Sequence, residues 1–150
     1  MTDNASQQIH ATCINLEGFG ILLRGPSGSG KSDLALRMMH YNSQLIADDW
    51  VDLTREKGVL IARAPDRLRG LLEVRGVGII EVPHGISIRV QGMIDLVDSN
   101  KIQRLPDHQV EILLGVEIPS YQLDPWEISA IAKIQLVRGL LSGAIIRNDD

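Results

Sequence analysis

The chain has 150 residues, of which 44% are hydrophobic and 23% are charged, a composition typical of a soluble globular protein with one domain. Its formal net charge of −4 argues against a nonspecific nucleic-acid-binding or anionic-membrane-binding surface. No apolar run approaches the roughly 20 residues of a membrane span, and the single Cys13 excludes an internal disulfide, so we expect a cytoplasmic protein.

The first half of the chain predicts short strands joined by tight turns. Residues 1–8 are polar, lack the features of a signal peptide and are expected to be disordered. Residues 10–16 and 19–24 predict an antiparallel hairpin around Glu17-Gly18. A helix is expected after Lys31, fading near residues 42–43, and residues 45–47 predict a short buried strand. Residues 51–53 and 59–62 predict a second hairpin.

The second half of the chain predicts more strands and one clear helix. Residues 71–82 are strand-like, with glycines at 76 and 78, and residues 86–90 and 93–97 predict two further strands. Residues 100–107 are a polar connector, and residues 109–116 fit a strand or a helix. Residues 127–141 carry apolar residues at three- and four-residue spacing, which predicts an amphipathic helix.

A complete phosphate-binding loop, or P-loop, lies between the second predicted strand and the helix. Its positions are filled by Gly25, Pro26, Ser27, Gly28, Ser29, Gly30, Lys31 and Ser32. Glycines let consecutive N–H groups turn toward anionic oxygens, and the helix adds its positive dipole end. Because strand, loop and helix follow in order, a chance Gly/Ser-rich turn is the weaker explanation. We expect ATP as ligand, with Lys31 between its β- and γ-phosphates and Ser32 on Mg²⁺.

Three carboxylates and one histidine are candidates for the rest of the site. Asp48 and Asp49 end the predicted strand 45–47, where a carboxylate that orients Mg²⁺ is expected; the second could accept a proton, or Asp49 could merely cap a turn. Glu73 is either a metal ligand or the outward residue of an alternating strand. His10 is either a surface residue or a neighbour of the P-loop, if the first hairpin brings it there.

Four stretches together resemble the catalytic domain of HPr kinase/phosphorylase. They are His10, the loop 25–32, Leu45-Ile46-Ala47-Asp48-Asp49, and the run from Leu71 to Ile80 that contains Leu-Leu-Glu-Val-Arg-Gly-Val-Gly. The resemblance covers residues 10–97 well and the remainder loosely. It implies a single catalytic domain over residues 1–150, a short form without the family's additional N-terminal domain.

The resemblance also implies roles for individual residues. The family phosphorylates a serine of HPr, a phosphocarrier of the sugar phosphotransferase system, and can reverse the modification by phosphorolysis. Lys31 and the loop amides would bind the phosphates of ATP, while Ser32, Glu73 and Asp48 would serve Mg²⁺. Of the aspartate pair, Asp49 is the favoured general base, and His10 would help position it.

Two departures from the family pattern bear on the reverse reaction and on assembly. The family's long Gly-rich loop is cut short here, where Pro83-His84-Gly85 leads to Ile86. The family's Gly-Arg-Asn segment has its counterpart in residues 124–128, which contain no Arg. In the family, that Arg is an active-site residue that takes part in phosphorolysis, so the sequence leaves the reverse reaction open. It also leaves open whether the protein forms a homo-oligomer.

The sequence therefore predicts an α/β P-loop nucleotide-binding domain with a strand-rich mixed sheet and antiparallel hairpins. Its leading function is that of an ATP- and Mg²⁺-dependent protein-serine kinase acting on an HPr-like phosphocarrier. Two alternatives stay open at this point. One is a small-molecule kinase that kept the core site, and the other is a nucleotide-sensing module with little turnover.

Overall fold

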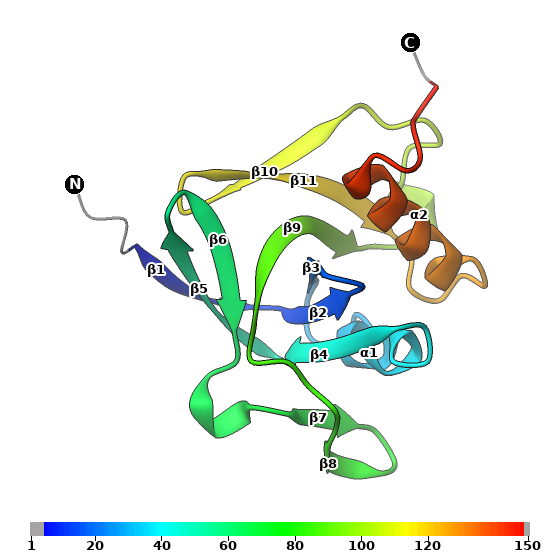
Figure 1. Ribbon diagram of the computed structural model, residues 1–150. Helices are drawn as coiled ribbons and strands as arrows, with labels where there is room; N and C mark the ends of the chain where they lie inside the picture. The colour runs from blue at the N-terminus through cyan, green and yellow to red at the C-terminus, as the bar shows by residue number, and fades with distance from the viewer. Residues whose placement is uncertain (1–4, 149–150) are drawn as a thin grey trace.

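The computed structural model describes residues 5–148, and they form a strand-rich α/β fold (Figure 1). The strands are β1 (Ser6–His10), β2 (Thr12–Leu16), β3 (Phe19–Arg24), β4 (Ser43–Ala47), β5 (Trp50–Glu56), β6 (Val59–Arg63), β7 (Leu71–Val74), β8 (Gly78–Glu81), β9 (Ser87–Leu96), β10 (Gln109–Leu113) and β11 (Val116–Leu123). The helices are α1 (Lys31–Met38) and α2 (Ala130–Ser142), with short 3₁₀ turns at Asp66–Leu68 and Ser99–Lys101. No helix among these residues is long and apolar enough to cross a membrane.

Strand β9 joins two parts of the main sheet, whose order is β1-β5-β6-β9-β3-β2-β4. Its first residues pair antiparallel with β6, and its later residues pair in parallel with β3 on one side and β11 on the other. Figure 1 shows β9 curving from one part to the other. The hairpin β7–β8 forms a separate small sheet, and β10 pairs with β11.

The core has two apolar clusters, one on each face of the strands around β3. Both helices cover one face, where residues such as Leu34 of α1 and Ile134 of α2 meet Ile21 and Leu23. The hairpin β5–β6 covers the other face, where Leu53 and Leu60 cluster with Leu22. This alternation along β3 buries the strand on both faces.

Local turn signals predicted both hairpins correctly. Strands β2 and β3 pair antiparallel around Glu17 and Gly18, whose φ angles are 51° and 91°. Strands β5 and β6 pair around Lys57 and Gly58, at 53° and 80°. Consecutive positive φ values are typical of the tight turns that match the twist of two-residue hairpins. Residues 109–116 contain no helix: they hold β10, a turn at residues 114–115 and the first residue of β11.

Several predicted boundaries were wrong. Residues 6–8 belong to β1, whereas the first part of the expected disordered segment lies outside the described residues. The predicted strand 10–16 is two strands, because the chain passes at Ala11 from pairing with β5 to pairing with β3. Residues 71–82 are a hairpin, residues 86–97 hold one strand, α1 ends at Met38 and α2 begins at Ala130.

Candidate functional site

The sheet brings the P-loop and the aspartate pair to one edge. Strand β4 is antiparallel to β2, and β2 is antiparallel to β3, so β4 and β3 run in the same direction. Their carboxyl ends therefore lie at the same edge of the sheet. The P-loop leaves β3 there, and Asp48 and Asp49 leave β4 there. This is the edge at which open α/β sheets bind ligands.

The P-loop has the backbone and the side chains that phosphate binding requires. Gly28 and Gly30 have φ angles of 82° and 98°, which side chains other than glycine rarely adopt. The Lys31 Nζ donates to the carbonyl oxygens of Gly25 at 2.7 Å and Pro26 at 3.1 Å. Among the described residues the buried Ser29 hydroxyl has no hydrogen-bond partner. The loop therefore offers an ammonium to an anion, whereas the Ser29 hydroxyl is enclosed against Gly25.

Lys31 is a buried cation beside the aspartate pair, with 7% of its surface exposed. Burial lowers the pKa of its amine, and the negative charges of Asp49 and Asp48 oppose that shift. A desolvated ammonium interacts more strongly with phosphate oxygens than an exposed one does, because the surrounding medium screens it less.

Asp48 is held as a fully engaged acceptor. It is 6% exposed, and three donors among the described residues reach its carboxylate. Its Oδ1 accepts from Ser32 Oγ at 2.7 Å and from Thr12 Oγ1 at 2.9 Å, and its Oδ2 accepts from the Glu73 N–H at 3.4 Å. Donors of this kind fix the direction of the carboxylate. Asp48 is therefore placed to hold a cation together with Ser32.

Thr12 is a residue of the site that sequence reasoning missed. It is fully buried in β2, and its hydroxyl contacts Asp48. The available signal was a polar residue within the apolar stretch of a predicted strand, since a buried hydroxyl needs a partner.

The replacement Thr12→Val keeps the shape of the side chain and removes the donor to Asp48. We expect it to lower the free energy of unfolding by about 1–3 kcal/mol, because a buried carboxylate loses a hydrogen bond. Urea denaturation measures the effect. Thr12→Ser, which retains the hydroxyl, is the control, and a valine variant as stable as the wild type would contradict the role assigned to this contact.

Asp49 differs from its neighbour in exposure and in backbone. Its side chain is 61% exposed, and its φ angle is 71°. The Trp50 N–H donates to the Asp48 carbonyl at 2.8 Å. This bond closes a γ-turn centred on Asp49, and γ-turns with a positive φ angle are rare and strained. Asp49 thus lies at a turn, which the sequence offered as an alternative to a role in the site, and this turn presents its carboxylate to solvent.

His10 reaches Asp49 by a route that the sequence did not reveal. Its Nε2 lies 2.7 Å from Asp49 Oδ1, and its ring meets the Trp50 ring edge-on at 5.2 Å. Strand β1 places it opposite Trp50 of β5, not opposite the strand that carries the P-loop. His10 therefore contacts Asp49, as the family resemblance implied, but the expected hairpin pairing of His10 with the strand that carries the P-loop is wrong.

Glu73 lies on β7 with its backbone against Asp48 and its side chain exposed. No group of three or more His, Cys, Asp or Glu side chains within residues 5–148 has metal-binding geometry. The Ser32 and Asp48 oxygens nevertheless suit Mg²⁺, which takes few protein oxygens and completes its shell with water and phosphate.

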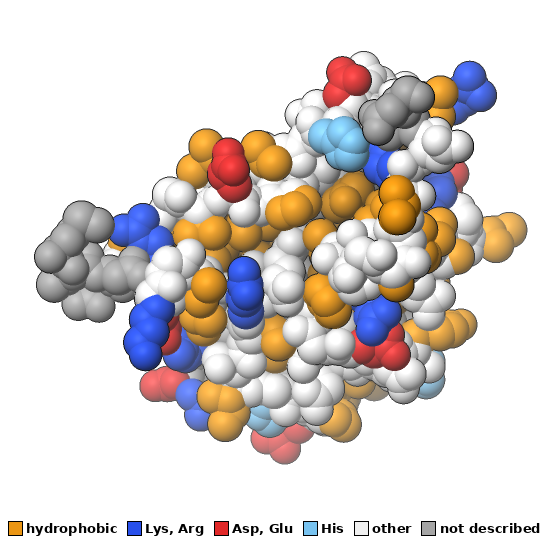
Figure 2. Space-filling model, turned by 45° about the horizontal axis from the view of Figure 1, so that its top comes forward, with side chains coloured by type: hydrophobic (Ala, Val, Ile, Leu, Met, Phe, Trp, Pro, Cys, Tyr) orange, Lys and Arg blue, Asp and Glu red, His pale blue; other side chains and the backbone are white. Residues whose placement is uncertain are grey.

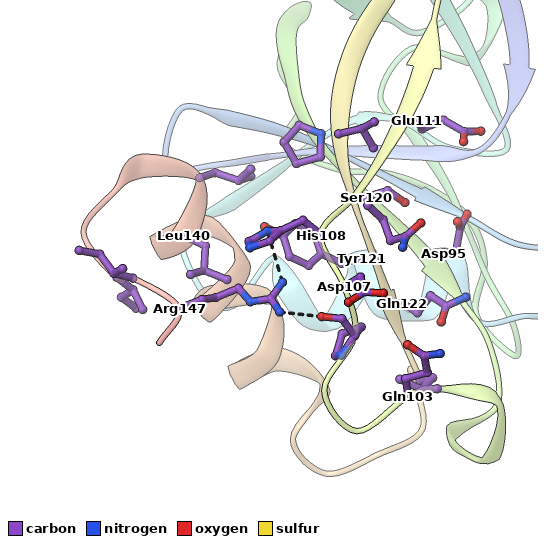
Figure 3. Close-up of a pocket in the computed structure, with 18 of the residues that line it drawn as sticks. Asp95, Gln103, Asp107, His108, Glu111, Ser120, Tyr121, Gln122, Leu140 and Arg147 are labelled. Carbon is purple, nitrogen blue, oxygen red and sulfur yellow. Dashed lines mark hydrogen bonds between the residues drawn. The ribbon is translucent and has the colours of Figure 1, made fainter. Parts of the chain in front are cut away.

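A large hollow lies elsewhere, between β10, β11, the end of α2 and residues 101–109, with a volume of about 1060 Å³. Figure 3 shows Arg147 reaching from the chain beyond α2 to Pro106 O, at 2.6 Å, and to His108 Nδ1, at 3.4 Å. Figure 2 shows hydrophobic side chains across this end of the molecule, where Val110 and Ile112 are exposed. None of the predicted site residues lines this hollow.

Comparison with known proteins identifies the family and the fold. Residues 3–134 match the model of the HPr Serine kinase C-terminal domain. The chain belongs to this family. The HPr kinase/phosphorylase of Chlorobium phaeobacteroides is 35% identical over 130 residues, covering 78% of this chain, and that of Malacoplasma penetrans is 36% identical over 135 residues, covering 81%.

The chain spans 40% and 45% of the length of these two relatives. A solved structure, the Hpr(Ser) kinase/phosphatase from Coxiella burnetii, superposes with a TM-score of 0.82 at 28% sequence identity, over 92% of each chain. These similarities confirm the resemblance stated above and the mixed, strand-rich P-loop fold.

Proposed function

We propose that this protein is an ATP- and Mg²⁺-dependent serine kinase whose substrate is an HPr-like phosphocarrier protein. Family membership and the names of the relatives support the reaction class and the partner. The observation that carries the proposal is the contrast between two adjacent aspartates beside a P-loop. Asp48 is buried and engaged by three donors among the described residues, whereas Asp49 is exposed and paired with His10.

This contrast supports a division of labour. Asp48 and Ser32 would hold Mg²⁺, with Glu73 close by, and the ion would supply neutralisation of phosphate charge. Lys31 would turn from the loop carbonyls to the phosphates, and the loop N–H groups would orient them. The phosphate site would then face the exposed carboxylate of Asp49.

Asp49 would act as general base. The serine Oγ of the carrier would form a bond to the γ-phosphorus as the bond from that phosphorus to the ADP oxygen breaks, and the serine proton would pass to Asp49. His10 would fix the direction of the Asp49 carboxylate through the contact at 2.7 Å, with Trp50 against its ring. Phosphoryl transfer needs mainly positioning and charge stabilisation, which these groups supply.

Transfer of radiolabel from the γ-phosphate of ATP to HPr-type carriers tests the proposal. We expect label on the wild-type carrier and none on a carrier with the target serine replaced by alanine. A chase with inorganic phosphate then reports whether pyrophosphate is released. Bound ATP without label on any carrier would contradict the proposal and favour a small-molecule kinase, if a hydroxylated metabolite is labelled, or a nucleotide-sensing module, if nothing is.

A further inference from the structure

Trp126 is an exposed aromatic residue in contact with the P-loop. It follows β11 in the chain. Because β11 is parallel to β9 and β9 is parallel to β3, the chain leaves all three strands at the same edge of the sheet. A Cβ atom added to Gly30 would lie 2.9 Å from Trp126 Cζ2 and 3.3 Å from Pro125 Cγ. The indole nevertheless leaves 62% of its surface to solvent.

The backbone that carries Trp126 is fixed from several directions. The Arg37 Nη2 of α1 donates to the Pro125 carbonyl at 2.6 Å. The Asp124 carboxylate accepts from the Trp126 N–H at 2.9 Å and from the Ser99 N–H at 3.0 Å. In Figure 1 the loop between β11 and α2 lies next to α1. An exposed indole on a rigid backbone can bind a flat ligand with little loss of backbone freedom.

The sheet order places Trp126 and the aspartate pair on opposite sides of the P-loop. Strand β2, which carries Thr12, and strand β4, which precedes Asp48, lie on one side of β3. Strands β9 and β11 lie on the other side. A nucleotide whose terminal phosphate faces the aspartates would therefore direct its other end toward β11. That end is the ribose and the base.

We propose that Trp126 is the stacking platform for the base of the bound nucleotide. This inference rests on the proposed function and adds a subsite to it, one that takes a planar heterocycle. A base offers the indole a π-face of matching size, and stacking needs no hydrogen-bond partner. The indole contacts the loop that would hold the phosphates, so a nucleotide bound there lies within its reach.

Comparing Mg²⁺-ATP with Mg²⁺-tripolyphosphate tests the platform, because tripolyphosphate has the phosphates but no base. We expect Trp126→Ala to raise the Kd of ATP about tenfold and to leave the Kd of tripolyphosphate unchanged. Trp126→Phe should keep most of the ATP affinity. Tyr41→Ala, which removes an exposed aromatic ring just beyond the other end of α1, is the matched control and should change neither Kd.

Tryptophan fluorescence supplies a second readout. ATP should change the emission of the wild-type protein more than tripolyphosphate does, and Trp126→Phe should abolish that difference, although Trp50 remains. Equal weakening of both ligands in Trp126→Ala would overturn the platform and show that the residue only supports the loop.

Other outcomes separate the platform from its premises. If the wild-type protein bound tripolyphosphate as tightly as ATP, only the platform would be overturned. If it bound neither ligand, both the platform and the proposed function would be overturned. If Trp126→Ala left the Kd of ATP unchanged but raised the KM for the carrier protein, the platform would also be overturned. Trp126 would then be an anchor for the carrier protein instead.

Discussion

Replacing Lys31 by alanine is expected to reduce phosphoryl transfer by at least about 10²-fold and to weaken ATP binding measurably. The lysine is buried, and its only described hydrogen bonds go to carbonyl oxygens of the loop. Its positive charge lies between the loop and the aspartate pair, where the surroundings screen it poorly. Removing it leaves the negative charges of Asp48 and Asp49 to repel the phosphates without an opposing ammonium.

Isothermal titration of Mg²⁺-ATP and the label-transfer assay together measure this effect. Lys57→Asn is the control, because Lys57 is exposed in the turn at the far end of β5 from Trp50, asparagine adopts its positive φ angle, and the change should affect neither quantity. Circular dichroism must show that both variants are folded. A folded Lys31→Ala protein that still binds ATP and transfers phosphate would refute the assignment of the P-loop.

The local structure around the candidate site, which the sequence predicted correctly, depends on neighbours in the chain. The P-loop is continuous, and its strand and helix lie on either side of it. Asp48 and Asp49 directly follow a short apolar strand that is buried as expected. Both hairpins have turn residues that adopt positive φ angles. In each case the physical cause lies within a few residues, so the pattern contains it.

The parts that the sequence did not predict depend on contacts between distant segments. His10 reaches Asp49 because β1 pairs with β5, and no local pattern states that pairing. The two strands predicted over residues 86–90 and 93–97 are one strand, β9, in which Gly92 pairs with Ile21 and packs against Leu141 of α2: an added Cβ would lie 2.8 Å from Leu141 Cδ1. A glycine required by packing and a glycine required by a turn look alike in a sequence.

Asp49→Asn is expected to reduce phosphoryl transfer by about 10²–10⁴-fold while leaving the Kd of Mg²⁺-ATP unchanged. Asparagine adopts the positive φ angle of this position as readily as aspartate, so the strained turn should survive. Its side-chain oxygen can still meet His10, whereas the amide cannot accept the serine proton. The substitution therefore removes proton acceptance with little change in geometry. Single-turnover label transfer and ATP titration on the same preparation measure the two quantities.

Asp48→Asn makes the test decisive, because the two aspartates are adjacent yet differently bonded. The amide is a poorer ligand for Mg²⁺, and its NH₂ group would face either the hydroxyls of Thr12 and Ser32 or the N–H of Glu73. We therefore expect Asp48→Asn to weaken Mg²⁺-dependent ATP binding and to need more Mg²⁺ for transfer. If Asp48→Asn instead abolished transfer at normal ATP affinity while Asp49→Asn remained active, Asp48 would be the base. The exposed strained turn at Asp49 would then need another explanation.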